Sequence, residues 1–330
     1  QAVANAPSAP RVATGVRPGL APSFGVQPRL APLNRRRWPQ EVAVAGGVVA
    51  GHIVNVAGYR FVAIDDRDRL QAVLRSLCTD LGLKGTVLLA PEGINFFLAG
   101  PQAAIEGFTA YLEQDERFRG IPLKTSYTDY QPFNRMNVRK KNEIISVGLD
   151  HINPADFTGP EIEPRAFKAM LDRGEHVHIL DTRNDYELRV GTFDNAIDLN
   201  IRTFRAFPEA IARLPDAMKD EPVVMFCTGG IRCEKASAIM LEAGFTNVKQ
   251  LKGGILGYFE EVGGEHWDGD CFVFDQRVAV NPALEETEVV VCFACREPLS
   301  VKEQQSPDYV IGTSCPYCID RGNMVPITDE

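Results

Sequence analysis

The stretch between residues 222 and 244 reads Pro-Val-Val-Met-Phe-Cys-Thr-Gly-Gly-Ile-Arg-Cys-Glu-Lys-Ala-Ser-Ala-Ile-Met-Leu-Glu-Ala-Gly, a pattern that predicts a strand, a tight loop and a helix. Val223 to Phe226 is a short apolar run, which is typical of a buried parallel strand. Glycines follow in the loop and allow backbone amides to turn inward. Cys233 to Ala243 then continues as a helix with an apolar side. Cys227 is therefore predicted at the N-terminal end of a helix.

A cysteine in this place is a candidate nucleophile, because a thiol reacts as its thiolate. Converging amides, the positive end of a helix and a nearby guanidinium all stabilise that anion. We therefore predict that Cys227 is catalytic, in a cradle formed by the rest of the loop: Thr228, Gly229, Gly230, Ile231 and Arg232. The competing interpretation is that Cys227 is a small buried apolar residue, as most free cysteines are. Cys233 is either a second reactive thiol or a buried helix residue.

Three segments resemble the rhodanese domain. Cys227-Thr-Gly-Gly-Ile-Arg232 is similar to its active-site loop, in which the cysteine carries a persulfide sulfur. Ile179-Leu-Asp-Thr-Arg183, with Tyr186-Glu187 and Gly191 after it, resembles the strand and turn that pack beside this loop. Val248-Lys-Gln-Leu-Lys-Gly-Gly-Ile255 resembles the closing strand and its Gly-Gly turn. The resemblance implies a rhodanese-like α/β domain with a parallel sheet over residues 160–262, its ligand crevice at the carboxyl ends of the strands.

Length and composition are those of a multidomain globular chain. The 330 residues allow two or three domains, and 45% hydrophobic with 24% charged residues predicts no membrane span. The net charge of −9 argues against a generally basic surface, so any RNA contact should be local. Four of the eight cysteines form two Cys-x-x-Cys pairs, which favours metal binding or thiol chemistry in a reducing compartment, here taken as cytoplasmic.

Residues 1–47 form a tail rich in Ala, Pro and Arg, with no acidic residue before Glu41. Such a segment buries too little apolar surface to offset its ordering entropy, so disorder is expected. A targeting peptide or an RNA-attracting arm are the alternatives.

Residues 52–148 predict a ferredoxin-like, or acylphosphatase-like, α+β domain with Cys78 in its core. Its order is β-α-β-β-α-β. The expected elements are strand Arg60–Ile64, helix Asp68–Leu81, strands Lys84–Ala90 and Ile94–Ala99, helix Gln102–Gln114 and strand Leu123–Thr128.

A basic cluster follows, made of Arg135, Arg139, Lys140 and Lys141, ahead of an expected apolar strand. It is either a solvated face or the place for RNA phosphate contacts. His176 and His178 alternate on a predicted strand without a Cys or acidic residue at ligand spacing, so we interpret them as structural.

Residues 265–330 predict a small cysteine-rich unit. Trp267 to Val280 is expected to form a strand after a turn, with Cys271 buried. Two Cys-x-x-Cys knuckles follow, Cys292-Phe-Ala-Cys295 and Cys315-Pro-Tyr-Cys318, and the 19 residues 296–314 separate them. This spacing predicts a structural zinc site with four thiolate ligands and no open position, formed by Cys292, Cys295, Cys315 and Cys318.

Taken together, three segments resemble the rhodanese-domain tRNA uridine(34) hydroxylase family: Lys84-Gly-Thr-Val-Leu-Leu-Ala-Pro-Glu-Gly-Ile-Asn95, the Cys227–Lys235 loop and Trp267-Asp-Gly-Asp-Cys-Phe-Val-Phe-Asp-Gln-Arg-Val-Ala-Val280. The resemblance covers roughly residues 52–320. It implies O2-dependent 5-hydroxylation of the wobble uridine of tRNA, bound by its anticodon stem-loop, with Cys227 as the catalytic residue. Phe96-Phe97 departs from the small Gly-Thr pair usual in the family.

Residue chemistry alone leaves other functions open, because no pattern here supplies an oxygen-activating metal or a flavin fold, and none identifies the reductant. The alternatives are a persulfide sulfurtransferase and a noncatalytic RNA-binding scaffold. A cysteine phosphatase is disfavoured, since such loops resemble this one but have five residues between cysteine and arginine, whereas this loop has four.

Overall fold

The computed structural model describes residues 52–320, which lie in one compact unit. The predictions made for residues 1–47 and for the last ten residues of the chain fall outside the described residues. None of the helices between residues 52 and 320 has the length and apolar character that crossing a membrane requires. The longest, α1, has 14 residues.

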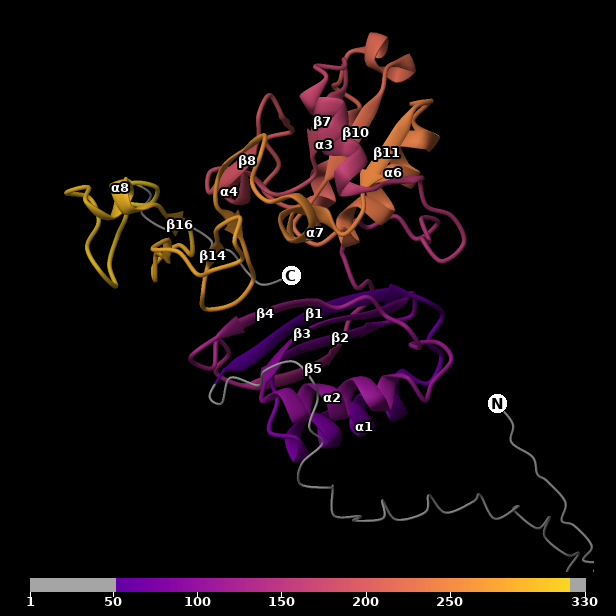
Figure 1. The fold of residues 1–330 in the computed structure, drawn as a ribbon, viewed down its shortest axis with the longest axis vertical. Coiled ribbons are helices and arrows are strands. Elements are labelled where there is room, and N and C mark those ends of the chain that lie inside the picture. The colour runs from indigo at the N-terminus through magenta and orange to yellow at the C-terminus, as the bar shows by residue number, and fades with distance from the viewer. Residues whose placement is uncertain (1–51, 321–330) are drawn as a thin grey trace, which may run out of the picture. The chain divides into compact units, whose positions relative to one another are not determined.

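The first layer is a five-stranded sheet in the order β4-β1-β3-β2-β5, with helices α1 and α2 on one face (Figure 1). The elements are β1 Ile53–Phe61, α1 Arg67–Asp80, β2 Lys84–Ala90, β3 Gly93–Gly100, α2 Gln102–Leu112, β4 Lys124–Thr128 and β5 Met136–Lys140. Apolar residues at helical spacing on α1, among them Leu70 and Leu74, pack with Phe108 of α2 against alternate residues of the strands. Cys78 is fully buried in this core, as predicted. The ferredoxin-like arrangement is confirmed.

Two sequence predictions in this layer are wrong. The first strand is Ile53–Phe61 and not Arg60–Ile64, because β1 is an interior strand that pairs with β3 on one side and β4 on the other along this length. The basic cluster does not precede a strand. Arg139 and Lys140 lie in β5, which pairs in parallel with β2, whereas Arg135 precedes the strand and Lys141 follows it. The apolar residues after the cluster form a loop. The Glu143 carboxylate accepts the amide hydrogens of Val147 and Gly148 and so closes that loop as a turn.

The second layer is a parallel sheet in the order β6-β11-β10-β7-β9. Its strands are β6 Glu161–Ile162, β7 His178–Asp181, β9 Ile197–Asp198, β10 Val223–Phe226 and β11 Val248–Leu251. The helices are α3 Pro164–Asp172, α4 Asp185–Leu188, α5 Phe207–Ile211, α6 Ile231–Glu242 and α7 Gly254–Val262, with short 3-10 turns at Phe204–Ala206 and Asp216–Asp220. Helix α3 begins at Pro164, a position where the fixed φ angle of proline suits the first turn of a helix.

The continuous apolar run of β10 is explained by its two buried faces. Val223 and Met225 pack into one core with α5 and α6, whereas Val224 and Phe226 pack into another with α3 and α7. A strand covered by helices on both sides needs apolar residues at every position. The predicted rhodanese-like α/β domain with a parallel sheet is confirmed.

The predicted long strand Trp267–Val280 is wrong. The segment forms three short strands, β12 Trp267–Gly269, β13 Cys271–Phe272 and β14 Ala279–Val280, and β12 pairs with β8 Gly191–Phe193. Gly269 and Val278 have positive φ angles of 86° and 62°, which interrupt an extended chain. Cys271 is buried, as predicted. A second hairpin, β15 Val290–Val291 with β16 Pro298–Leu299, and helix α8 Val301–Gln304 follow.

Candidate active site

Cys227 lies directly after β10, and α6 begins four residues later, so the predicted strand, loop and helix are confirmed. Gly230 precedes the helix with a φ of 100°, which favours glycine. The α7 turn packs closely from the other side: a Cβ atom on Gly254 would lie 2.4 Å from the Cys227 carbonyl oxygen. From the neighbouring strand, the Thr182 hydroxyl donates to the Phe226 carbonyl at 2.9 Å. The segments that carried the rhodanese resemblance therefore meet around Cys227.

The Cys227 sulfur is buried and accepts the Gly230 amide hydrogen at 3.1 Å. Burial by itself opposes the charged form. Against it, the Cys233 thiol, the Arg232 guanidinium and the backbone amides of Arg232 and Cys233 lower the pKa of Cys227 to about 6. The loop thus stabilises a thiolate at neutral pH.

Cys233 has the opposite character. Burial, together with the hydrogen bond to Cys227, raises its pKa well above the usual value. Its sulfur also lies 3.7 Å from the Thr182 hydroxyl. Cys233 is therefore a protonated donor beside the Cys227 thiolate.

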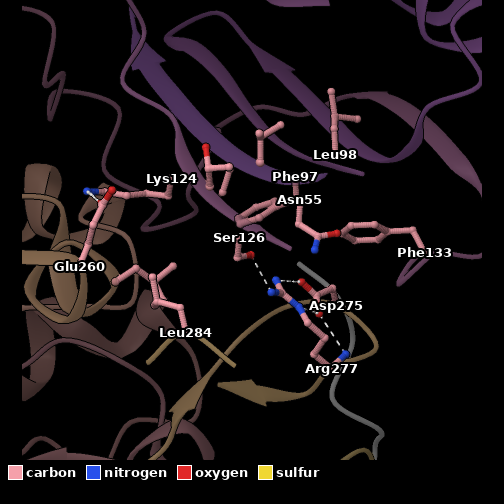
Figure 2. A pocket seen from close by; sticks show the side chains of 14 residues that line it. Asn55, Phe97, Leu98, Lys124, Ser126, Phe133, Glu260, Asp275, Arg277 and Leu284 are labelled. Atoms are coloured by element: carbon pink, nitrogen blue, oxygen red, sulfur yellow. Dashed lines mark hydrogen bonds and ion pairs between the residues drawn. The ribbon is translucent and has the colours of Figure 1, made fainter. Parts of the chain in front are cut away.

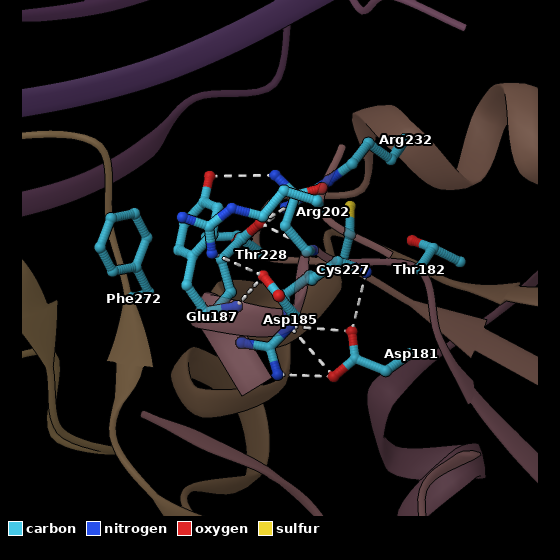
Figure 3. A network of polar contacts seen from close by, with 12 residues as sticks. Asp181, Thr182, Asp185, Glu187, Arg202, Cys227, Thr228, Arg232 and Phe272 are labelled. Atoms are coloured by element: carbon cyan, nitrogen blue, oxygen red, sulfur yellow. Dashed lines mark hydrogen bonds and ion pairs between the residues drawn. The ribbon is translucent and has the colours of Figure 1, made fainter. Parts of the chain in front are cut away.

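Arg232 does not face Cys227 as an isolated charge. Its two terminal nitrogens donate to the two carboxylate oxygens of Glu187 at 2.5 and 2.8 Å, and Thr228 donates to the same carboxylate at 3.2 Å (Figure 3). Glu187 is fully buried. Burial would raise its pKa, but Arg232 outweighs that effect and lowers it. This bidentate pair fixes the plane of the guanidinium. Tyr186-Glu187 lies in a segment that resembles the rhodanese domain, but no sequence pattern predicts the pairing of Glu187 with Arg232.

The ferredoxin-like domain also contributes to the site through Tyr59, a residue for which the sequence predicted no role. The Tyr59 hydroxyl of β1 donates to Glu234 at 3.2 Å, and a Cβ atom on Gly230 would lie 3.0 Å from it. Burial, followed by the charge of Glu234, raises the pKa of Tyr59 well above the usual value. Tyr59 therefore remains a neutral phenol at the edge of the cysteine loop.

A buried ion cluster lies next along α6. The Lys235 amine is 2.8 Å from Glu92 and 2.6 Å from Glu143, two carboxylates of the ferredoxin-like domain. The Lys235 side chain is only 1% exposed. Burial raises the pKa of Glu92 and outweighs the opposite effect of Lys235, and the charge of Glu143 adds to the increase. No sequence pattern predicts that Glu92 or Glu143 pairs with Lys235.

The predicted RNA-binding residues lie elsewhere. Arg135, Arg139 and Lys140 are exposed and Lys141 is half-buried, and Lys140 pairs with Asp68 of α1. Within residues 52–320 no hydrogen bond or ion pair joins these four residues to the cysteine loop. Lys124 of β4 lies beside the Gly253-Gly254 turn that packs on this loop: its amine would lie 2.6 Å from a Cβ atom on Gly253, and it is 3.6 Å from Glu260.

A pocket lies between the sheet of the ferredoxin-like domain and the segments that follow α7 (Figure 2). Phe97 and Ser126 line one side, and Arg277, which donates to Ser126 at 2.7 Å, lines the other. Its volume of about 50 Å³ admits a few water molecules only. It is therefore not a nucleobase pocket in this conformation.

Two clusters have the composition of metal sites. The first joins the four cysteines predicted to bind zinc, whose sulfur atoms all lie within 4.8 Å of one another. The second joins His176 and His178 with Glu221, which comes from the segment before β10. The sequence interpretation that no acidic residue accompanies these histidines is therefore wrong, because Glu221 is distant along the chain. His176 is 72% exposed and the cluster lies apart from Cys227.

Comparison with known protein families follows the division seen in the fold. Residues 53–144 match the model of the UPF0176 acylphosphatase-like domain, and residues 163–261 match that of the rhodanese-like domain. Among solved structures, a rhodanese-like domain protein from Staphylococcus aureus is 25% identical, with a TM-score of 0.26. That match covers 30% of this chain and 91% of that one.

Curated relatives match over most of the chain. The tRNA uridine(34) hydroxylase of Cupriavidus pinatubonensis is 52% identical over 274 residues, which are 82% of this chain and 97% of the relative. The protein of the same name from Burkholderia vietnamiensis is 51% identical over 275 residues, with 81% and 97% covered. The chain therefore belongs to the tRNA uridine(34) hydroxylase family.

Proposed function

We propose that this protein hydroxylates uridine 34, the wobble uridine of tRNA, at C5, with O2 as co-substrate and Cys227 as the catalytic residue. The observation that carries the proposal is the 52% identity to a named tRNA uridine(34) hydroxylase over 97% of that relative. Replacing C5–H by C5–OH puts one oxygen atom of O2 into the product and the other into water. The reaction therefore consumes two electrons and two protons from an external reductant.

The geometry supports a division of roles within the loop. Cys227 supplies a thiolate, the form in which a thiol is nucleophilic. The Gly230 amide and the Cys233 thiol donate toward its sulfur, and Arg232, held by Glu187, adds positive charge. All eight cysteines are free, which supports a reducing compartment such as the cytoplasm as the site of action.

The substrate must be brought to a buried sulfur. Cys227 is fully buried, with Tyr59 at the edge of its loop, so an anticodon base has to leave its stack and part Tyr59 from α6 to reach it. The stem phosphates need cations, for which the exposed residues Arg135, Arg139 and Lys140, with Lys141, are the proposed contacts. Lys124 is a further cation near the loop.

The test is mass spectrometry of nucleosides from tRNA of a deletion strain without a redundant pathway. The strain is complemented with the wild type, with Cys227→Ala, or with Cys78→Ala, a matched buried cysteine in the other domain. We expect nucleosides derived from 5-hydroxyuridine with the wild type and Cys78→Ala only. Equal amounts with Cys227→Ala would favour a noncatalytic RNA-binding role, and unchanged nucleosides in the deletion strain would exclude the proposed reaction.

A persulfide sulfurtransferase is the second candidate. It is favoured by the close pair Cys227 and Cys233, because a neighbouring thiol can release a bound sulfur by forming a disulfide. Incubation with thiosulfate and other sulfane donors, followed by intact mass measurement, tests it. A gain of one sulfur atom that is lost in Cys227→Ala supports this activity, and no gain with any donor excludes it.

A further inference from the structure

The four-cysteine site, made of Cys292, Cys295, Cys315 and Cys318, has the dimensions of a metal tetrahedron. The sulfur of Cys315 lies 3.5 Å from that of Cys295 and 3.7 Å from that of Cys318. Four sulfur atoms at about 2.3 Å from a central Zn²⁺ are about 3.8 Å apart, since a tetrahedron's edge is about 1.6 times its radius. All four cysteines are free. The spacing between the sulfurs therefore fits a shared ion.

The unit around this site has little else to hold it together. Its core contains one fully buried apolar side chain, Leu299, besides three of the cysteines, with a few partly buried residues around them. Cys292 and Cys295 lie in the turn between β15 and β16, where the Cys292 amide donates to the Glu297 carbonyl at 2.9 Å. A segment with so small a core requires a staple, and a metal ion is the usual one when disulfides are absent.

Both knuckles are attached to the same residue of the rhodanese-like domain. The Glu297 carboxylate, which is 3% exposed, accepts hydrogen bonds from Arg189 and Arg202. The Arg189 guanidinium also lies 4.3 Å from the ring centroid of Tyr317, which belongs to the second knuckle. The relative position of the two knuckles thus determines whether Arg189 can make both contacts.

Arg189 and Arg202 both connect the C-terminal unit to α4, the helix that contains Glu187. Arg189 is the C-terminal cap of α4, and Arg202 donates to Asp185, the first residue of α4, at 3.1 Å. Glu187 lies between these two attachment points. Figure 3 shows Arg202, Asp185 and Glu187 in one network with Arg232, close to Cys227. Polar contacts therefore connect the four-cysteine site to both ends of α4, and the backbone of this short helix carries Glu187, which pairs with Arg232.

We propose that the four-cysteine site holds one structural Zn²⁺ ion, which positions Glu187 through Arg189 and Arg202. Glu187 in turn holds Arg232, so loss of the ion loosens the charge that favours the Cys227 thiolate. The ion takes no part in the reaction, because four thiolates leave it no open position. Glu297 and Glu187 are positioning residues in this scheme.

The first experiment measures the metal in the purified full-length protein. Elemental analysis should give one zinc per chain, and Co²⁺ exchanged into the site should show the intense thiolate charge-transfer bands of tetrahedral coordination. Cys318→Ser should lose the ion, whereas Cys318→His, which retains a zinc-binding ligand set, should keep it. The growth medium is supplemented with zinc. If the purified protein nevertheless contains no zinc, or contains iron in its place, the assignment is wrong.

The second experiment measures the coupling through the alkylation rate of Cys227 by iodoacetamide, followed by peptide mass spectrometry across pH. The groups that face Cys227 are Arg232 and Cys233 of α6 and Tyr59 of β1, and none of them is altered. Glu297→Gln removes the carboxylate but leaves the four ligands. Glu288→Gln, an exposed glutamate of the same unit, is the matched control.

We expect Glu297→Gln, and the chelator-treated wild type, to raise the apparent pKa of Cys227 by about half a unit. This is about a threefold loss of thiolate well below that pKa. Glu288→Gln and Cys318→His should behave as the wild type does. If zinc is present but neither its removal nor Glu297→Gln changes the pH profile, the ion has no influence on the cysteine loop and the coupling is wrong. Because no tRNA is used, neither outcome depends on the proposed hydroxylation.

Discussion

Three buried cysteines of this protein differ in the pKa of their thiols. Cys227, Cys78 and Cys271 are all fully buried, yet burial raises the pKa of Cys78 and of Cys271 to about 12, whereas that of Cys227 is about 6. The difference comes from the Cys233 thiol, the Arg232 guanidinium and the amides at the start of α6. Burial alone would have made all three cysteines inert.

This difference predicts the pH dependence of alkylation. The thiolate of Cys227 predominates above pH 6, so its rate should be half-maximal near pH 6 and level at higher pH. Cys78 and Cys271 should stay unmodified up to pH 9 in the folded protein. Cys233→Ala removes a donor and should move the midpoint upward. A midpoint near 8.5 in the wild type would contradict the stabilised thiolate.

Glu187 should matter more for stability than an ordinary glutamate. Glu187→Gln leaves the buried Arg232 without its counter-charge, and breaking one side of a buried pair costs about 3–5 kcal/mol. Urea unfolding measures this cost. Glu209→Gln, at an exposed position in α5, is the control and should change stability by less than about 0.5 kcal/mol. Equal effects of the two substitutions would show that the pair is not the buried clamp described above.

At the scale of elements, the site depends on how closely α7 approaches the end of β10. The amides of Ile255 and Leu256, in the first turn of α7, donate to the carbonyls of Cys227 and Thr228 at 2.9 and 3.1 Å. Only a residue without a side chain allows this approach, which explains the second glycine of the Gly253-Gly254 turn. The Gly253-Gly254 turn and the start of α7 therefore hold the cysteine loop on one side, and α6 packs on the other.

Gly254→Ala tests this approach against a matched glycine. Gly254 and Gly174 have the same positive φ angle of 62°, but a Cβ atom on Gly174 meets nothing within 4 Å. The two alanine variants therefore share the backbone strain and differ in the clash. Gly254→Ala should cost about 1–3 kcal/mol more in thermal or urea unfolding and should slow alkylation of Cys227. Equal stability of the two variants would contradict the close approach.

At the scale of the whole molecule, the ferredoxin-like and rhodanese-like domains are joined at α6 itself. Lys235 extends from α6, the helix that follows the cysteine loop, to Glu92 and Glu143. Glu234 of the same helix accepts a hydrogen bond from the Tyr59 hydroxyl. The two domains therefore share the polar groups beside the site. A buried amine with two carboxylates is tolerated only while all three remain together.

Lys235→Met should destabilise the protein by about 3–5 kcal/mol, because it leaves two carboxylates, each only 14% exposed, without a cation. Lys249→Met, at an exposed position of β11, is the control. The loss of unfolding free energy in Lys235→Met should become smaller as the pH falls toward the pKa values of the two glutamates, since protonation removes the unpaired charge. The pKa of Glu92 is already raised by burial. A deficit that is the same at pH 5 and pH 8 would contradict this account.

Replacing Arg139, Lys140 and Lys141 by Ala tests whether this basic cluster binds tRNA phosphates. We expect weaker tRNA binding and a shallower dependence of affinity on salt, by about one unit of slope for each phosphate that the variant no longer neutralises. The alkylation rate of Cys227 without tRNA should not change. If both affinity and salt slope are as in the wild type, the cluster is a solvated face.

The sequence alone determined the features that depend on neighbouring residues. The strand, loop and helix at 222–244, the place of Cys227 at the end of the strand and the grouping of the paired cysteines of the C-terminal unit all follow from spacing within a few turns of chain. The tertiary structure decided the rest. Glu187 meets Arg232 across 45 positions, Lys235 meets Glu143 across 92 and Tyr59 meets Glu234 across 175. The register of β1 was likewise decided by its two partner strands. Local patterns encode backbone preference, whereas the partner of a buried charge is determined only when packing brings distant segments together and removes water from between them.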